Sequence, residues 1–159
     1  MDREQADRLA VSLDMVTDLE TLGVKVGSNS VAVLLAVEDT NVLRFVCTTP
    51  LVRERLAGLE FPSGRGFSGM AYVYQQPMRV NDVREDGWAA HYAEIDQATG
   101  LTTHNIIIAP VTGMQQEWGL LTAINSERPN GFNTDDLEKL IRSAELIAGE
   151  LDQTSSRDT

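Results

Sequence analysis

Residues 30–49 read SVAVLLAVEDTNVLRFVCTT, two apolar runs separated by the polar link Asp39-Thr40-Asn41. Both runs are rich in β-branched residues, which favour extended strands. A short polar link between two such runs is typical of a hairpin turn. The stretch therefore predicts a β-hairpin near the middle of a sheet.

Further strands are predicted on the C-terminal side of this hairpin. Residues 104–111 (HNIIIAPV) and 118–126 (WGLLTAINS) are apolar runs joined through Thr112-Gly113-Met114. A short strand is also expected just before the glycine-rich stretch at residues 64–69, and another at residues 78–82 (MRVND). Together these runs indicate an antiparallel sheet of about five or six strands.

Helices are predicted at both ends of the chain. Apolar residues spaced three or four apart indicate an amphipathic N-terminal helix within residues 1–24, ending near Gly23. The same spacing indicates a C-terminal helix over residues 133–152, followed by a polar, disordered tail at 153–159. With three shorter helical segments expected between the strands, the fold class is predicted to be α+β.

Length and charge narrow the classes of function. The chain has 159 residues, a size predicted to form one domain over residues 1–159, and a formal net charge of −11. An acidic surface repels nucleic acids and anionic membranes, so neither is an expected partner. No apolar run approaches the length of a membrane span, and one cysteine cannot form an intrachain disulfide, so a cytoplasmic location is expected.

Residues 64–69 (GRGFSG) satisfy a glycine-rich phosphate-binding pattern. The surrounding sequence does not predict the parallel β-α-β unit of a dinucleotide fold. One interpretation is a helix that begins near Phe67, with backbone N–H groups facing an anion beside Ser68. The alternative is a tight turn and an ordinary helix start.

Three polar side chains precede the apolar strand at residues 104–111. Asp96, Thr99 and Thr103 are spaced so that all three can converge on one small polar ligand. The alternative is local hydrogen bonding, because Asp and Thr side chains often bind N–H groups in turns. The sequence leaves both interpretations open.

The start of the C-terminal helix has a simple structural explanation. Asn133 fits the N-cap position, and Asp136, three residues later, can bond back to it as in a capping box. Phe132 and Leu137 occupy the two positions of a hydrophobic staple. Asn125, at the end of the preceding strand, is not explained by this capping pattern.

Few residues are suited to catalysis. The chain has two histidines, His91 and His104, and neither has an evident serine or cysteine partner in the sequence. Cys47 lies in an apolar strand, where a buried and unreactive thiol is the usual outcome. No catalytic or metal site is predicted, and the protein is not expected to be an enzyme.

Taken together, these segments resemble a GAF domain, the small-molecule sensor module of signalling proteins. The resemblance spans nearly the whole chain and is carried by residues 61–83 (FPSGRGFSGMAYVYQQPMRVNDV), 95–111 (IDQATGLTTHNIIIAPV) and 118–137 (WGLLTAINSERPNGFNTDDL). It implies a PAS-related central antiparallel sheet with a ligand pocket on one face. The N- and C-terminal helices are then expected on the other face, where such domains often form homodimers.

The closest resemblance within the family is to the cyclic-nucleotide-binding branch of phosphodiesterases and adenylate cyclases. The spacing of Asp96, Thr99 and Thr103 matches ligand-binding positions of that branch, which makes cAMP or cGMP the first candidate ligand. The ligand-binding residues that the resemblance implies are Phe67, Ser68, Asp82, Tyr92, Asp96, Thr99 and Thr103.

One motif of that branch is incomplete. The branch has an Asn-Lys pair, then a Phe, and then an Asp-Glu pair. This chain keeps Asn125, Phe132 and Asp136 but has Ser126 in place of the Lys and Leu137 in place of the Glu. The resemblance implies that the missing Lys removes an ion pair with Asp136.

The histidines and the cysteine bear on other ligand classes of the GAF family. Haem-binding relatives carry a histidine just before the strand that begins here near His104, which makes haem the alternative ligand. Bilin-binding relatives need a cysteine near the pocket helix, and Cys47 does not match that position. GAF-type methionine sulfoxide reductases use several cysteines, whereas this chain has one.

The expected function is therefore a non-catalytic sensor that passes ligand occupancy through its terminal helices to a downstream signalling protein. A GAF domain that acts only as a dimerisation module is the other possibility. In that case, substitution of Leu140 and Ile147 on the last helix is expected to yield monomers.

Overall fold

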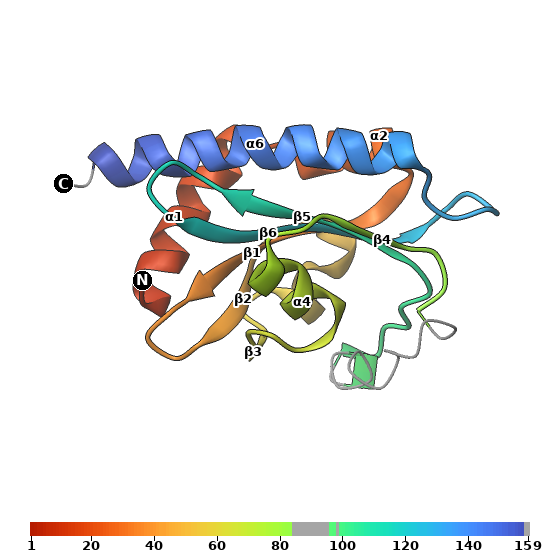
Figure 1. Cartoon of the computed structure of the whole chain (residues 1–159), viewed down its shortest axis with the longest axis horizontal. Coiled ribbons are helices and arrows are strands. Elements are labelled where there is room, and N and C mark those ends of the chain that lie inside the picture. Colours follow the sequence, from red (N-terminus) through yellow and green to blue (C-terminus); the bar gives the residue numbers. More distant parts are fainter. Residues whose placement is uncertain (84–95, 98, 158–159) are drawn as a thin grey trace.

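The computed structural model describes residues 1–83, 96–97 and 99–157. A six-stranded antiparallel sheet forms its centre, with the strand order β3-β2-β1-β6-β5-β4 (Figure 1). The strands are β1 (Ser28–Val37), β2 (Val42–Thr48), β3 (Glu60–Pro62), β4 (Met78–Val80), β5 (Ile106–Thr112) and β6 (Glu117–Ser126). The predicted α+β class and antiparallel sheet are confirmed.

The hairpin of β1 and β2 lies in the interior of this sheet. The two strands pair in one register from Val37 with Val42 as far as Leu34 with Phe45, and the register then shifts at Val33. The turn between them places Asn41 at a φ of 59°. Asn tolerates this left-handed conformation better than most residues, which suits the short link. Since β6 pairs with the other edge of β1, the predicted position of the hairpin near the middle of the sheet is confirmed.

Helices cover the two faces of the sheet unequally (Figure 1). One face, which we call the helix face, carries α1 (Arg3–Val16), α2 (Leu19–Val26) and the long α6 (Thr134–Arg157). The opposite face, the pocket face, carries the 3-10 turn η1 (Pro50–Val52) and the short helices α3 (Arg53–Leu56) and α4 (Gly66–Tyr74). None of the described helices is long and apolar enough to cross a membrane.

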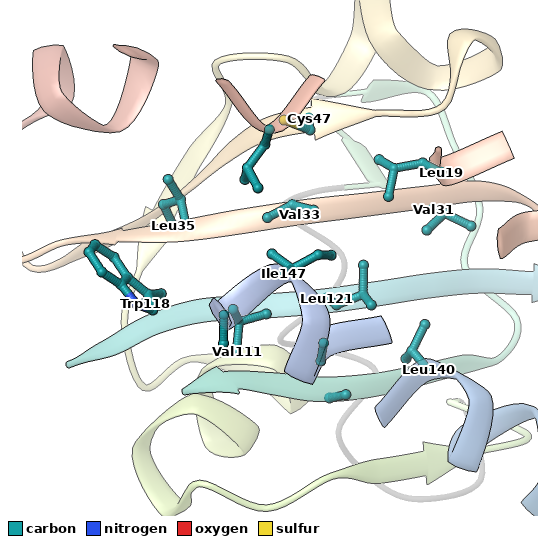
Figure 2. Close-up of a cluster of buried hydrophobic side chains, with 14 of the residues drawn as sticks. Leu19, Val31, Val33, Leu35, Cys47, Val111, Trp118, Leu121, Leu140 and Ile147 are labelled. Atoms are coloured by element: carbon teal, nitrogen blue, oxygen red, sulfur yellow. The ribbon is translucent and has the colours of Figure 1, made fainter. Parts of the chain in front are cut away.

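Alternation along β1 separates the two cores. Val33 and Leu35 belong to the core of the helix face, whereas Ala32 and Leu34 belong to that of the pocket face. Figure 2 shows the helix-face core, in which side chains of the sheet pack against side chains of the terminal helices. Burial of each large apolar side chain stabilises the fold by about 1.5–3 kcal/mol.

Leu140 and Ile147 form part of this core rather than an outer surface. Their exposed fractions are 0% and 3%, and both side chains point from α6 toward the sheet (Figure 2). The expectation that these two residues hold a dimer together is therefore wrong. Substituting them would destabilise the domain itself, so it cannot report on dimer formation.

The predicted N-terminal helix is in fact two helices. α1 ends at Val16, and Asp18 caps α2 by accepting a hydrogen bond from the Thr21 N–H at 3.0 Å. The second helix then runs through Gly23 to Val26 and ends where Gly27 adopts a φ of 78°. Apolar spacing alone did not predict this break, because the leucines on both sides of it face the same core.

The C-terminal helix is longer than predicted. It continues to Arg157, so the expected disordered tail is wrong for residues 153–157, while residues 158–159 lie outside the described residues. The Asp152 carboxylate accepts hydrogen bonds from the Trp118 indole N–H at 2.9 Å and the Met114 N–H at 2.8 Å. These bonds attach the last turns of α6 to the β5–β6 hairpin.

The helix predicted over residues 87–100 can be assessed only at its end. Asp96, Gln97 and Thr99 are helical, and Gly100 follows at a φ of 72°. The earlier part of that prediction lies outside the described residues.

Candidate ligand pocket

A cavity of about 50 Å³ lies on the pocket face of the sheet. About 10–15 Å³ of such space holds one water molecule, so the cavity has room for several waters or a small organic molecule. Its described lining residues come from five strands, α3, the start of α4 and the segment before β5. They are Ser30, Ala32, Phe45, Leu56, Phe61, Arg65, Ser68, Asp96, Leu101, Thr103, Ile106, Thr122 and Ile124.

One wall of the cavity is formed by Asp96 and Thr103. One carboxylate oxygen of Asp96 accepts a hydrogen bond from the Thr103 N–H at 2.9 Å, and the other accepts from the Thr103 hydroxyl at 2.9 Å. The structure therefore combines the two interpretations of this sequence. The two residues bond to each other as in a turn, and both line the cavity.

Thr99 has a more local role than Asp96 and Thr103. Its side chain is buried, and its hydroxyl accepts a hydrogen bond from the Leu101 N–H at 3.2 Å. Thr99 is not among the described residues that line the cavity. It supports the backbone that leads from Asp96 to Thr103.

The glycine-rich stretch shapes the entry to α4. Gly64 and Gly66 adopt φ values of 89° and 67°, a region that strongly favours glycine. A side chain at Gly69 would come within 2.5 Å of the Gly64 backbone, so that position requires close packing of the helix on the turn. The three glycines are thus explained by backbone geometry, and the anion interpretation stays a prediction.

Of the two ligand-binding residues predicted at the start of α4, one reaches the cavity. Ser68 is buried and lines it, whereas the ring of Phe67 packs into the pocket-face core. Arg65, at the N-cap position, also lines the cavity but is exposed to solvent.

The sheet contributes two hydroxyls that sequence reasoning missed. Ser30 on β1 and Thr122 on β6 line the floor of the cavity, and Thr122 is 5% exposed. Within the described part of the chain, neither hydroxyl has a hydrogen-bond partner. The available signal was alternation, because Thr122 lies between Leu121 and Ala123, which face the other core.

Asn125 fixes the segment that carries Thr103. Its side-chain carbonyl accepts a hydrogen bond from the His104 N–H at 2.7 Å, and its amide donates to the Thr102 carbonyl at 2.7 Å. Asn125 itself has a φ of 59°. Its predicted place in a structural motif thus acquires a definite role, which is to clamp the wall of the cavity to the end of β6.

Asp136 has a cationic partner despite the missing Lys. Ser126 cannot form the ion pair of the missing Lys, but the buried Asp136 carboxylate pairs instead with Arg128, two residues further along, which was not anticipated from the sequence. The predicted capping box is confirmed: the Asp136 N–H donates to the Asn133 side chain at 2.8 Å, and the Asn133 N–H donates back at 2.9 Å. Phe132 is buried beside it in the helix-face core.

Some predicted residues do not reach the cavity. Asp82 is exposed after β4 and is not among the described lining residues, and Tyr92 lies outside the described residues. His104 is exposed and also does not line the cavity, so its position does not fit a haem ligand there. His91 lies outside the described residues.

Cys47 lies on the opposite side of the sheet from the cavity. Its thiol is buried in the helix-face core (Figure 2). The thiol donates to the Ala10 carbonyl at 3.5 Å. Burial, together with the nearby carboxylate of Asp14, raises the pKa of Cys47 to about 12. Such a thiol is protonated at neutral pH. Within the described residues, no three Asp, Glu, His or Cys side chains gather as a metal site would require.

Comparison with known proteins supports the architecture. The second GAF domain of DevS from Mycobacterium smegmatis aligns at a TM-score of 0.71 and 17% identity, covering 94% of this chain and 97% of that one. The cyanobacteriochrome receptor PixJ aligns at 0.68 and 16%, covering 95% and 99%.

Free methionine-R-sulfoxide reductase from Neisseria meningitidis, in complex with its substrate, aligns at a TM-score of 0.67 and 19% identity, covering 94% of this chain and 87% of that one. No curated protein matches the chain. The sequence profile of the GAF domain matches residues 5–151. The chain therefore belongs to the GAF domain family.

Proposed function

We propose that this GAF domain is a non-catalytic sensor that binds a small molecule in the cavity of the pocket face. The observation that carries the proposal is the convergence of Asp96, Thr103 and Ser68 with the sheet hydroxyl of Thr122 around one cavity. A mainly apolar cavity with a few placed polar groups is the usual form of a small-molecule site. The substrate complex of the structurally similar reductase shows that a protein of this fold can hold a small molecule.

A chain of hydrogen bonds supports transmission from the cavity to α6. The wall at Thr103 is clamped by Asn125, as described above, and the next residue of β6, Ser126, donates its N–H to the Asn105 side chain at 2.7 Å. The Ser126 hydroxyl accepts from the Arg128 N–H at 3.2 Å, and the Arg128 guanidinium reaches Asp136 in the first turn of α6.

Movement of the wall on ligand binding therefore has a direct route to the start of α6. A ligand shifts a conformational equilibrium only as far as it binds one state better. In this proposal, occupancy favours one position of the wall, and the bonded chain passes that preference to α6 and on to a downstream signalling protein.

The cyclic nucleotide stays a prediction. Asp96, Thr103 and Ser68 do line one cavity, which favours it. The present cavity of about 50 Å³ is much smaller than the 300–1,000 Å³ of typical ligand pockets, so cAMP or cGMP would require the cavity to open.

We also propose a cellular location and an oligomeric state for this sensor. The single cysteine supports a cytoplasmic location. The net charge of −11 argues against binding to nucleic acids or anionic membranes. A homodimer through the terminal helices is supported by apolar side chains that remain exposed there. Val11 and Met15 on α1 and Leu146 on α6 are 65%, 82% and 74% exposed. Introducing a charge by Leu146→Glu tests this contact without disturbing the core, and we expect the variant to be monomeric.

Native mass spectrometry of the protein as purified tests the proposed function. We expect a bound small molecule, or one that binds from a metabolite extract, and we expect Ala32→Leu to remove it. Ala32 is 2% exposed and lines the cavity, so the larger side chain fills the ligand space. Unchanged binding in that variant, with the fold confirmed by circular dichroism, would place the ligand elsewhere and overturn the proposal.

Calorimetry with cAMP and cGMP tests the specific prediction. Binding should weaken in Asp96→Ala and Thr103→Ala. An absence of heat at millimolar nucleotide would eliminate the cyclic nucleotide but leave the sensor proposal intact.

A further inference from the structure

We infer that the cavity selects an uncharged, largely apolar small molecule, which it holds by hydrogen bonds from Thr122 and Ser30 on the sheet. This inference rests on the proposed function and specifies its ligand class. Four observations carry it: the bonding of the cavity wall, the unpaired floor hydroxyls, the charges around the cavity and its apolar lining.

Asp96 and Thr103 in the cavity wall are already hydrogen-bonded to each other. Each oxygen of the Asp96 carboxylate accepts from Thr103, one from its N–H and one from its hydroxyl. A ligand that took over these groups would first break bonds of 2.9 Å within the protein. The wall therefore balances much of its own polarity, and a ligand can reach Asp96 only at the acceptor sites that Thr103 leaves open.

The hydroxyls on the cavity floor are available for hydrogen bonds to a ligand. The hydroxyls of Thr122 and Ser30 have no hydrogen-bond partner among the described residues. Both residues lie on the pocket side of their strands: Thr122 pairs with Ala32, and Ser30 pairs with Ile124, and all four line the cavity. The benefit of a ligand that supplies the missing partner is larger at Thr122, which is buried, than at Ser30, which is partly exposed.

Charge around the cavity favours a neutral ligand. Among the described lining residues, Asp96 and Arg65 are charged, and their charges are opposite. Arg65 is exposed to solvent at the rim. A charged group placed between them on the floor would meet hydroxyls and apolar side chains such as Phe45 and Leu56, and burial of a charge without a partner is costly.

Four single-ring probes test the inference by ligand-observed NMR. Benzyl alcohol is uncharged and carries one hydroxyl, whereas toluene is uncharged and has no hydroxyl. Benzoate is an anion and benzylammonium is a cation. We expect benzyl alcohol to bind most tightly, because it alone supplies both apolar surface and a neutral hydrogen-bonding group. Toluene should follow, and the two ions should bind at least about tenfold more weakly than benzyl alcohol.

Two substitutions locate the hydrogen bonds. Thr122→Val keeps the shape of the side chain and removes the hydroxyl, and Ser30→Ala removes the other. Each substitution should weaken the binding of benzyl alcohol by about three- to tenfold and leave the binding of toluene nearly unchanged. Thr112→Val is the matched control, because Thr112 is exposed at the end of β5 and does not line the cavity.

The outcomes separate this inference from the proposed function. The inference alone would be overturned if benzoate or benzylammonium bound as tightly as benzyl alcohol. It would also be overturned if benzyl alcohol bound equally to wild type, Thr122→Val and Ser30→Ala. Both conclusions require that Ala32→Leu still abolishes binding. Probe binding that survives Ala32→Leu would overturn the proposed site and the inference with it. No binding of any probe would overturn the inference alone, because native mass spectrometry tests the site independently.

Discussion

The two faces of one sheet use the same strands for different purposes. On the helix face, Leu121 and Leu140 are fully buried and the Trp118 N–H is bonded to Asp152. On the pocket face, the same strand β6 turns Thr122 toward a cavity, and its hydroxyl lacks a partner among the described residues. The difference shows where the fold has completed its own packing and where it is arranged to receive another molecule.

The largest expected effect compares two isoleucines on the two faces. Ile147→Ala should destabilise the domain by about 2–5 kcal/mol, because the side chain is 3% exposed and a void remains in the helix-face core. Ile124→Ala should cost less than about 2 kcal/mol, because Ile124 is partly exposed and already borders a cavity. Equilibrium unfolding in urea measures both values, and equal losses would contradict the distinction between the faces.

A smaller effect is expected where the cavity wall connects to α6. Arg128→Gln leaves the buried Asp136 carboxylate without its guanidinium and should destabilise the domain by about 1–3 kcal/mol. Lys139→Gln is the matched control, because it removes an exposed pair with Asp135 that is worth about 0.3–0.5 kcal/mol. Thermal unfolding measures both, and similar losses in the two variants would argue against a structural connection through Arg128.

A still smaller effect is expected from an ionic network that joins α1 to the sheet edge. Arg3 bonds to Glu60 at 2.6 Å, and Arg44 bonds to both Glu60 at 2.9 Å and Asp7 at 3.0 Å. The Arg3 hydrogen bond, followed by that of Arg44, lowers the pKa of Glu60. The stabilisation that this pair of contacts provides is therefore present above the unfolded pKa of about 4.3 and is lost as pH falls through the lowered folded pKa.

The variant Glu60→Gln isolates this contribution. As the pH is lowered from 5, the free energy of unfolding measured in urea should fall less steeply for this variant than for wild type. Glu4→Gln, at a side chain that is 82% exposed, should follow the wild-type curve. Parallel curves for wild type and Glu60→Gln would show that the network does not couple stability to pH.

The smallest effect is expected at Cys47. Because the thiol is 3% exposed and burial raises its pKa to about 12, iodoacetamide at pH 8 should not label the folded protein measurably. Unfolding in urea should restore ordinary labelling, as followed by mass spectrometry. Rapid labelling of the folded protein would mean that the helix face opens far more readily than its packing indicates.

The sequence was sufficient for the sheet and the start of α6. The hairpin around Asn41 and the reciprocal bonds of Asn133 and Asp136 depend on local turn and cap chemistry, which adjacent residues specify. The break at Asp18 and the extension of α6 to Arg157 were missed for different reasons. Asp18 interrupts a continuous apolar stripe, and the end of α6 is held by residues from a distant hairpin.

The candidate site was predictable only in part. Asp96, Thr103 and Ser68 reach the cavity as the resemblance implied, but the bonds between Asp96 and Thr103 could not be inferred from spacing. Thr122 was missed because its alternation with Leu121 and Ala123 places it on the other face of β6 but does not show that a cavity lies there. Arg128 was missed because it lies two residues from the motif position and meets Asp136 only after the intervening turn folds.

The most direct test of the division between the two faces is a titration of isotope-labelled protein with benzyl alcohol, followed by amide chemical shifts. We predict that the largest changes occur at Ser30, Thr103 and Thr122, with smaller changes at Asn125 and Arg128 along the route to α6. Largest changes at Leu140 and Ile147, with the cavity residues unaffected, would place binding on the helix face and contradict the account.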